Sequence, residues 1–166
     1  MEDDFQSINT DVWSYEIQRG GFGSGTFEWT TKDPRNAYTD AEGLHIVPTL
    51  TTEDTGLSRD QMIDNYVLNM TTDSTCTTKG INECSIRSNK TSGDIINPVR
   101  SARLTTKGRK SIAFGKVEVV AKMPQGDWLW PAIWMMVSNH PSLCYTILSS
   151  IARRRYLRQM APLRRD

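Results

Sequence analysis

Short runs in which apolar and polar residues alternate dominate the chain up to about residue 136, and they predict β-strands. In residues 114–122, Val117 and Val119 alternate with charged side chains, as in a half-buried antiparallel strand. Residues 99–106 precede this run across a segment that contains a glycine, which predicts a β-hairpin. The predicted strands are residues 2–6, 26–30, 43–50, 66–71, 99–106, 114–122 and 129–136.

Residues 129–136 carry apolar side chains on both faces of the predicted strand. Trp130 and Trp134 fall on one face, and Ile133 and Met135 fall on the other. Two apolar faces predict a central strand that is covered on both sides. The pattern also allows a second interpretation, in which the tryptophan face lines a groove and its indoles stack on a ligand. Planar aromatic rings suit the apolar faces of sugar rings.

Only one segment of the body has helical character. Residues 58–65 predict a helix, because Ser58 and Gln61 have the spacing of a capping box. Residues 72–96 are polar and predict a long surface loop. The pattern as a whole therefore predicts an all-β fold with little helix.

The composition changes abruptly after residue 137. Residues 1–137 contain 14 Lys and Arg against 18 Asp and Glu, a net charge of −4, whereas residues 138–166 contain 6 Arg and 1 Asp, a net charge of +5. The acidic body argues against a nucleic-acid partner. No apolar run reaches 18 residues, so no membrane span is expected. The acidic start MEDDF does not resemble a signal peptide.

The cysteines and sequons of the chain are typical of an oxidising compartment. Cys76 and Cys84 are close enough in the sequence to form a disulfide that closes a short loop, whereas Cys144 is isolated. Two N-glycosylation sequons, at Asn69 and Asn89, lie on either side of the cysteine pair. No Cys or His spacing indicates a metal site, and no cofactor is expected.

A glycine-rich stretch, RGGFGSGT, has the first part of a phosphate-loop pattern. Gly20 and Gly25 have the Walker spacing, but Thr26 stands where that motif needs lysine. The stretch therefore predicts a glycine-rich turn, or an open loop at a cleft.

Residues 101–136, SARLTTKGRKSIAFGKVEVVAKMPQGDWLWPAIWMM, resemble the signature of glycoside hydrolase family 16. The similarity is to its laminarinase-like and β-1,3-glucan-binding members, most of all the fungal ones. The upstream stretches DDFQSINTDVWSYEIQRGGFG and NAYTDAEGLHIVPTL resemble the opening strands of that family. The resemblance implies a concanavalin-like β-jelly-roll sandwich, of which residues 1–137 are an N-terminal portion.

By the same resemblance, the function is hydrolysis or transglycosylation of β-glucans, with two carboxyl groups about 5–5.5 Å apart. The family supplies both groups from one strand, in a motif like E-[IL]-D-[IL]-x-E. No E-x-D-x-x-E or E-x-D-x-E occurs in this sequence, so no catalytic residue is assigned and the chain is expected to be inactive. The alternative is a non-catalytic β-1,3-glucan-binding protein, because some family members keep the cleft without the carboxylates.

The resemblance assigns four substrate-binding residues, and each has a structural alternative. The residues expected to contact glucan are Asn36, Arg103, Trp130 and Trp134. The alternatives are an ion pair between Arg103 and Glu118, and a core position for each tryptophan. The expected partner is a β-1,3/1,6-glucan, and a monomer is expected. The full-length parent is expected to be extracellular or in the cell wall.

Residues 138–166 have no counterpart in the resemblance and are expected to lie outside the fold. Three interpretations fit this basic tail: a product of truncation or mis-splicing, a basic amphipathic helix, or a disordered tail. The start at Met1 also fits an internal methionine with a secretion signal or membrane anchor upstream.

Overall fold

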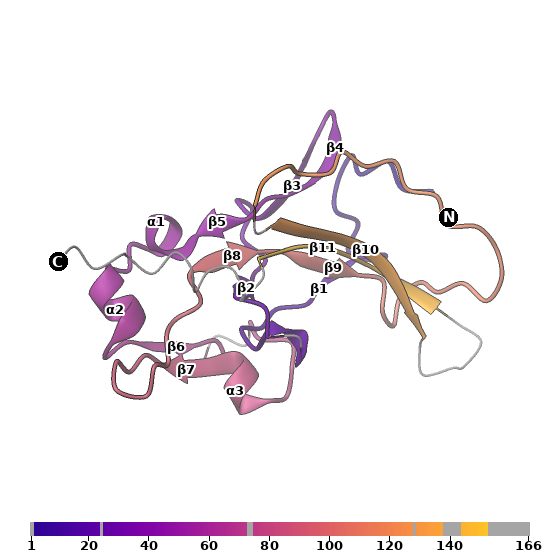
Figure 1. Cartoon of the computed structure of the whole chain (residues 1–166). Helices are drawn as coiled ribbons and strands as arrows, with labels where there is room; N and C mark the ends of the chain where they lie inside the picture. The colour runs from indigo at the N-terminus through magenta and orange to yellow at the C-terminus, as the bar shows by residue number, and fades with distance from the viewer. Residues whose placement is uncertain (1, 24, 73–74, 128, 138–143, 153–166) are drawn as a thin grey trace.

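The described part of the chain is mostly β, with three short α-helices and one 3₁₀ turn, Gly21–Gly23 (Figure 1). The computed structural model describes residues 2–23, 25–72, 75–127, 129–137 and 144–152, and of residues 150–152 only the backbone. The first strands and helices are β1 (Ser14–Tyr15), β2 (Glu28–Thr30), β3 (Ala37–Asp40), β4 (Gly43–Ile46), β5 (Thr49–Leu50), α1 (Thr51–Thr55) and α2 (Arg59–Ile63). They are followed by β6 (Val67–Asn69), α3 (Ile81–Cys84), β7 (Ser85–Arg87), β8 (Val99–Ser101), β9 (Arg103–Thr105), β10 (Leu129–Val137) and β11 (Cys144–Ala152).

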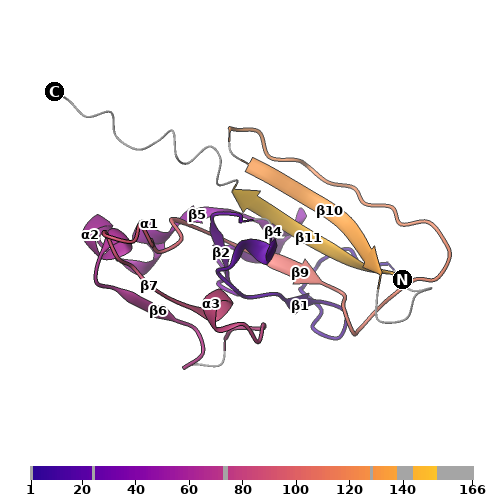
Figure 2. The same ribbon diagram turned by 60° about the horizontal axis from the view of Figure 1, so that its bottom comes forward.

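The largest sheet has four antiparallel strands in the order β1-β9-β11-β10 (Figure 2). A three-stranded sheet has the order β2-β8-β5, in which β2 and β8 are parallel. Two antiparallel pairs, β3-β4 and β6-β7, complete the described strands. In both views the four-stranded sheet lies at one end of the molecule, and α1, α2 and the β6-β7 pair lie at the other.

Two apolar clusters fill the interior. The cluster under the large sheet joins β9 and β11 to the segment before β1, and it consists of Val12, Trp13, Leu104 and Leu148. The cluster at the helical end consists of Ile17, Leu57, Met62, Leu68, Met70 and Ile96. Burying these side chains supplies the main favourable term for folding, at about 25 cal/mol per Å² of apolar surface.

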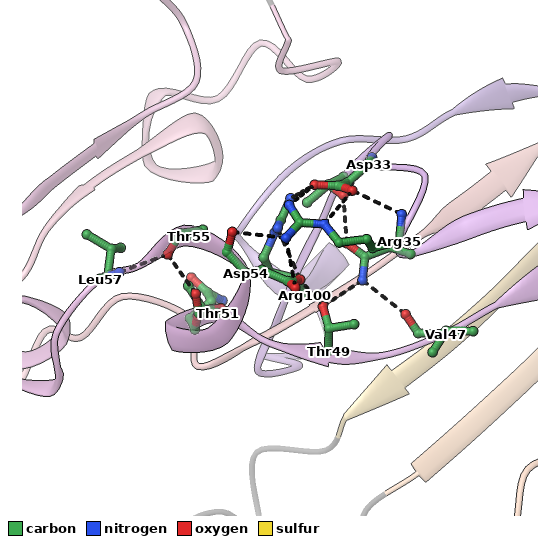
Figure 3. A network of polar contacts seen from close by, with 12 residues as sticks. Asp33, Arg35, Val47, Thr49, Thr51, Asp54, Thr55, Leu57 and Arg100 are labelled. Carbon is green, nitrogen blue, oxygen red and sulfur yellow. Dashed lines mark hydrogen bonds and ion pairs between the residues drawn. The ribbon is translucent and has the colours of Figure 1, made fainter.

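A buried ion-pair network ties β8 to helix α1 and to the loop after β2 (Figure 3). The Nη2 of Arg100 lies 2.9 Å from Oδ2 of Asp33, and its Nη1 lies 3.1 Å from Oδ2 of Asp54. Arg35 contacts the same two aspartates from the surface, where its side chain is 52% exposed, against 7% for Arg100. One guanidinium therefore links three segments that are far apart in the sequence.

Several predicted elements are confirmed. Strands lie within residues 26–30, 43–50, 66–71, 99–106 and 129–136. Helix α2 begins after Ser58, whose side chain accepts a hydrogen bond from the backbone N–H of Gln61, while the Gln61 side chain accepts one from Ser58 N–H. This is the predicted capping box.

Two predicted strands are wrong. Residues 114–122 form no strand, and Val120 is 99% exposed. The reason is that β11 occupies the place beside β9, so the predicted hairpin with residues 99–106 does not form. Residues 2–6 also form no strand, because the Asp3 carboxylate accepts hydrogen bonds from Phe5 N and Trp13 Nε1 and fixes a local turn.

Strand β10 also differs from its prediction as a central, doubly covered strand. It lies at the edge of the four-stranded sheet, paired with β11 alone among the described strands. Its two faces are about equally exposed, at 40% for both Trp134 and Ile133. A Pro131 inside the strand suits such an edge, since proline has no N–H to donate to a second neighbour.

Part of the predicted basic tail belongs to the largest sheet. Cys144–Ala152 forms β11 and pairs with both β9 and β10. Its run of Tyr145, Thr146, Ile147 and Leu148 has high β-propensity, and Ile147 is fully buried. The structure therefore differs from the expectation of a tail outside the fold for these residues. Residues 138–143 and 153–166 lie outside the described part, so a domain boundary after residue 137 stays a prediction.

Cys76 and Cys84 form a disulfide, and Cys144 is a free thiol. Both sequon asparagines, Asn69 and Asn89, are exposed, and their glycosylation stays a prediction. Within the described residues, no helix has the length and apolar character needed to cross a bilayer.

Candidate functional site

Arg103 is the centre of the candidate site. It lies on β9 between β1 and β11, and its side chain is only 7% exposed. Its Nε is 2.6 Å from Oε2 of Glu16, and Glu16 N–H donates a hydrogen bond of 2.9 Å to the Arg103 carbonyl. The ion pair with Glu118 that sequence reasoning left open does not form, because Glu118 pairs with Lys116.

Two aromatic rings pack against the Arg103 guanidinium. Its central carbon lies 3.7 Å from the centroid of the Phe22 ring and 5.1 Å from that of Trp134. Both distances allow cation–π attraction, which strengthens when the cation is removed from water. The guanidinium is thus held by one carboxylate and two rings from three separate segments.

The glycine-rich loop places Phe22. The backbone of Phe22 has φ 49° and ψ 34°, in the left-handed region. Its neighbour must be small, because a Cβ on Gly21 would lie 2.5 Å from Thr26 N and 2.8 Å from Thr26 O. The loop therefore folds back on itself tightly, and this turn carries Phe22 to Arg103.

The register of the sheet explains why Arg103 reaches Trp134. Arg103 is opposite Ser149 on β11, and Ser149 is opposite Ala132 on β10. Directly opposed residues share a face of the sheet, so Trp130 and Trp134, two positions either side of Ala132, share that face with Arg103. The intervening Ser149 is small enough for the arginine to extend across β11.

The two tryptophans leave indole surface open to solvent. Trp130 is 39% exposed and Trp134 is 40% exposed. Four residues along a strand place their α-carbons about 13 Å apart. The two indoles thus offer two flat, partly apolar surfaces on the face of the sheet that also carries Arg103.

The electrostatics of the site keep a positive charge next to the aromatic rings. Burial lowers the pKa of the Arg103 guanidinium, and the Glu16 and Glu28 carboxylates oppose that shift. An arginine remains protonated under these conditions. Glu28 is itself buried and accepts a 2.9 Å hydrogen bond from the Thr26 hydroxyl.

Asn36 lies apart from this cluster. It is fully buried, its Oδ1 accepts a hydrogen bond from Thr31, and its Nδ2 donates to Val47 O and to Thr49 Oγ1. The two bonds from Nδ2 join the loop before β3 to β5 and to the residues just before it. The arrangement indicates a structural role, so a contact between Asn36 and glucan stays a prediction that the geometry does not favour.

Three residues that the resemblance assigned, Arg103, Trp130 and Trp134, lie on one face of the sheet, and their contact with glucan stays a prediction. Sequence reasoning did not assign Phe22 or Glu16 to the site. Phe22 had a signal, since it lies in the glycine-rich stretch that predicts an open loop at a cleft. Glu16 had none, because its pairing with Arg103 depends on the β1-β9 register across 87 residues of sequence. Within the described ranges, no cluster of His, Cys, Asp and Glu is arranged to bind a metal.

Comparison with known proteins finds relatives that match most of the chain. It is 39% identical over 143 residues to a beta-1,3-glucan-binding protein of Penaeus monodon, across 85% of this chain and 38% of that protein. It is 31% identical over 168 residues to Gram-negative bacteria-binding protein 2 of Drosophila melanogaster, across 99% of this chain and 34% of that protein. The chain thus spans little more than a third of the length of these relatives.

Similarity to an enzyme covers a much shorter stretch. A beta-glucanase of Rhodothermus marinus is 50% identical over 36 residues, which are 22% of this chain and 13% of that protein. No family model matches the chain. No solved structure matches it either. The relatives are therefore glucan-binding and bacteria-binding proteins over most of the chain, and glucanases over a short part.

Proposed function

We propose that this chain binds β-1,3-glucan without hydrolysing it, as part of a glucan-recognition protein. The observation that carries the proposal is the half-exposed Trp134 ring held against the buried Arg103 guanidinium. An ordered, partly exposed indole is a surface on which the apolar face of a sugar ring can stack. Trp130 offers a second such surface on the same face.

Arg103 fits this role as a positioning residue. Its contacts with Glu16, Phe22 and Trp134 restrict the indole before any ligand arrives. A preorganised ring loses less side-chain entropy on binding, at about 0.5–1.5 kcal/mol for each side chain that would otherwise be immobilised. The buried arginine thus supports affinity by fixing the ring.

Binding is favoured over hydrolysis, although hydrolysis or transglycosylation was the function that the sequence resemblance implied first. The relatives that match 85% and 99% of the chain carry binding names, whereas the glucanase from R. marinus matches 22%. The carboxylate motif of family 16 is absent from the sequence. The alternative interpretation from the sequence, a non-catalytic β-1,3-glucan-binding protein, is therefore the better supported one.

The finer features implied by the resemblance belong to the same proposal. We infer that the strands belong to the jelly-roll sandwich of family 16; the mostly β, largely antiparallel architecture supports this. We also infer an extracellular or cell-wall location for the full-length protein, because the Cys76–Cys84 disulfide needs an oxidising compartment to persist. A fungal subtype, binding of β-1,6-linked branches and a monomeric state stay predictions.

Sedimentation with insoluble β-1,3-glucan tests the proposed function. The 166-residue chain is incubated with the particles, and the bound fraction is measured after centrifugation. We expect retention on β-1,3-glucan that soluble laminarin competes away, and little retention on an inert polysaccharide resin. An equal bound fraction on both solids, or none on either, would contradict the proposal.

A further inference from the structure

A cavity of about 460 Å³ lies beside the glycine-rich loop, between the loop on one side and α3 and residues 93–98 on the other. Its volume is in the range of small-ligand sites, about 300–1,000 Å³. Its lining includes Arg19, Gly20, Phe27, Asn82, Glu83 and Asp94. None of them belongs to the Arg103–Trp134 site.

The walls of this cavity are fixed by hydrogen bonds. Arg19 donates from Nε to Asn97 Oδ1 and from Nη1 to the Asn82 carbonyl, each at 3.0 Å. Asn97 donates back to the Arg19 carbonyl at 3.0 Å, and Arg19 N–H donates to the Glu83 carbonyl at 2.8 Å. The Cys76–Cys84 disulfide holds the end of α3 next to Glu83. The cavity is therefore bounded by ordered segments.

A close approach of backbone and side chain shapes one wall. A Cβ on Gly20 would lie 2.8 Å from Cγ of Glu83, so only glycine leaves room for the Glu83 stem. The Glu83 carboxylate accepts a hydrogen bond from the Thr78 hydroxyl, which orients it. Asp94 is oriented in the same way by a 2.6 Å hydrogen bond from Ser92.

The lining chemistry matches a neutral, hydroxyl-rich ligand. Each carboxylate has about four acceptor positions, so the bonds from Thr78 and Ser92 leave Glu83 and Asp94 able to accept more. The Asn82 amide both donates and accepts, as sugar hydroxyls do. Phe27, Ile95 and Pro98 are the apolar residues of the lining used here, and such residues suit the C–H face of a sugar ring. Two carboxylates against one arginine disfavour an anionic ligand.

We propose that this cavity is a second carbohydrate site, which binds a terminal residue of a neutral oligosaccharide. The assignment of a carbohydrate rests on the proposed function, whereas the location rests on the cavity itself. The two sites share the glycine-rich loop, because that loop provides Phe22 to the Arg103–Trp134 site and Gly20 and Gly25 to the cavity. One glucan chain, or two chain ends, can then contact both sides of the loop.

Laminaritriose, a soluble β-1,3-linked glucose trimer, is the probe for a test on the full 166-residue chain. Amide NMR shifts of Asn82 and Asp94 report on the cavity, and a quenching titration of tryptophan fluorescence reports on the Trp130–Trp134 face. We expect both signals to saturate. In Asn82→Ala and Glu83→Gln, the affinity read at the cavity amides should fall at least tenfold, with the fluorescence midpoint changed less than twofold.

Trp134→Ala is the matched opposite variant, which should reduce the fluorescence response and leave the cavity amides responsive. If the fluorescence titrates but the cavity amides do not shift at millimolar trimer, the second site is overturned and the proposed function stands. If neither signal responds and the chain does not sediment with β-1,3-glucan, the proposed function fails as well. Amide dispersion shows whether each variant folds, and Asn82→Ala serves as the test should Glu83→Gln not fold.

Discussion

The guanidinium of Arg103 lies 5.1 Å from the centroid of the Trp134 ring, although the two residues are on strands separated by β11. Neighbouring strands are about 4.8 Å apart, so the arginine side chain spans one full strand to reach the indole. It can do so because the residue it crosses is Ser149. The relationship holds the Trp134 ring beside a buried cation, on the face of the sheet that also carries Trp130.

This relationship predicts that glucan binding depends on the face of β10 that is altered. Trp134 and Ile133 are adjacent and equally exposed at 40%, but they point to opposite faces. We expect Trp134→Ala to weaken sedimentation with β-1,3-glucan about tenfold. Without the indole, the apolar face of the stacked sugar stays in water, and roughly 60 Å² of apolar surface at about 25 cal/mol per Å² is worth about 1.5 kcal/mol. Ile133→Ala should bind like the parent chain, and equal losses in both variants would refute the assignment of the binding face.

The local elements of the fold could be predicted because their signals lie in adjacent residues. The Ser58–Gln61 capping box marked α2, and a short run of apolar and aromatic residues marked β10. What failed was strand pairing. Residues 114–122 alternate as a strand should, yet whether a strand forms depends on a partner edge, and the edge of β9 is occupied by β11. The sequence pattern indicates which segments suit a β-sheet, but it does not indicate which segment pairs with a given strand.

The sequence indicated Arg103, Trp130 and Trp134 as candidate site residues, but not the residues that hold Arg103 in place. Trp130 and Trp134 follow from a strand-like run, whereas Glu16 and Phe22 reach Arg103 through the register of β1 and the turn at Gly21. Asn36 shows the opposite limit. The sequence does not distinguish a structural asparagine from one that binds a ligand. The structure does, because the Asn36 side chain is buried and makes three hydrogen bonds within the protein.

The ion-pair network predicts a strong asymmetry between two arginines. Replacing Arg100 with methionine leaves the Asp33 and Asp54 carboxylates without their buried partner, and breaking a buried pair costs about 3–5 kcal/mol. Arg35→Met removes contacts with the same two aspartates at the surface, where an ion pair is worth about 0–1 kcal/mol. Urea denaturation gives both free energies of unfolding; similar losses in the two variants would be inconsistent with this description.

The same network predicts a loss of stability in acid. Hydrogen bonds from Arg35 and Arg100 hold the pKa of Asp33 well below its ordinary value. The folded state therefore binds a proton at Asp33 less readily than the unfolded state does. The ionised carboxylate stabilises the folded state fully above about pH 4, and this stabilisation is lost as the pH falls below that value. Denaturation at pH 7, 5 and 3 should show a steep fall between the last two. Asp33→Asn should be less stable at pH 7 and less dependent on pH below 5, and an unchanged acid slope would disprove the assignment to Asp33.

The disulfide predicts that reduction destabilises the helical end of the molecule. The Cys76–Cys84 bond closes a loop with a sequence separation of 8 residues, for which loss of the cross-link costs roughly 2–3 kcal/mol in chain entropy. We expect the melting temperature to fall on adding dithiothreitol, and the double variant Cys76→Ser/Cys84→Ser to show the low value with or without reductant. Cys144→Ser, which removes the free thiol, should keep the response to reductant. A melting temperature insensitive to reductant would contradict a structural role for the bond.

The carboxylates around the candidate site predict that this chain does not hydrolyse β-glucan. Retaining hydrolysis needs two carboxyl groups about 5–5.5 Å apart, one on each side of a scissile bond. The two acids near Arg103 do not meet this need. Glu16 is ion-paired with Arg103, and Glu28 is buried and accepts a hydrogen bond from the Thr26 hydroxyl. Laminarin incubated with the purified chain should therefore release no more reducing sugar than laminarin alone, while an endo-β-1,3-glucanase serves as the positive control. Release that disappears in Glu16→Gln or Glu28→Gln would show that one of these acids is catalytic and that binding is not the whole function.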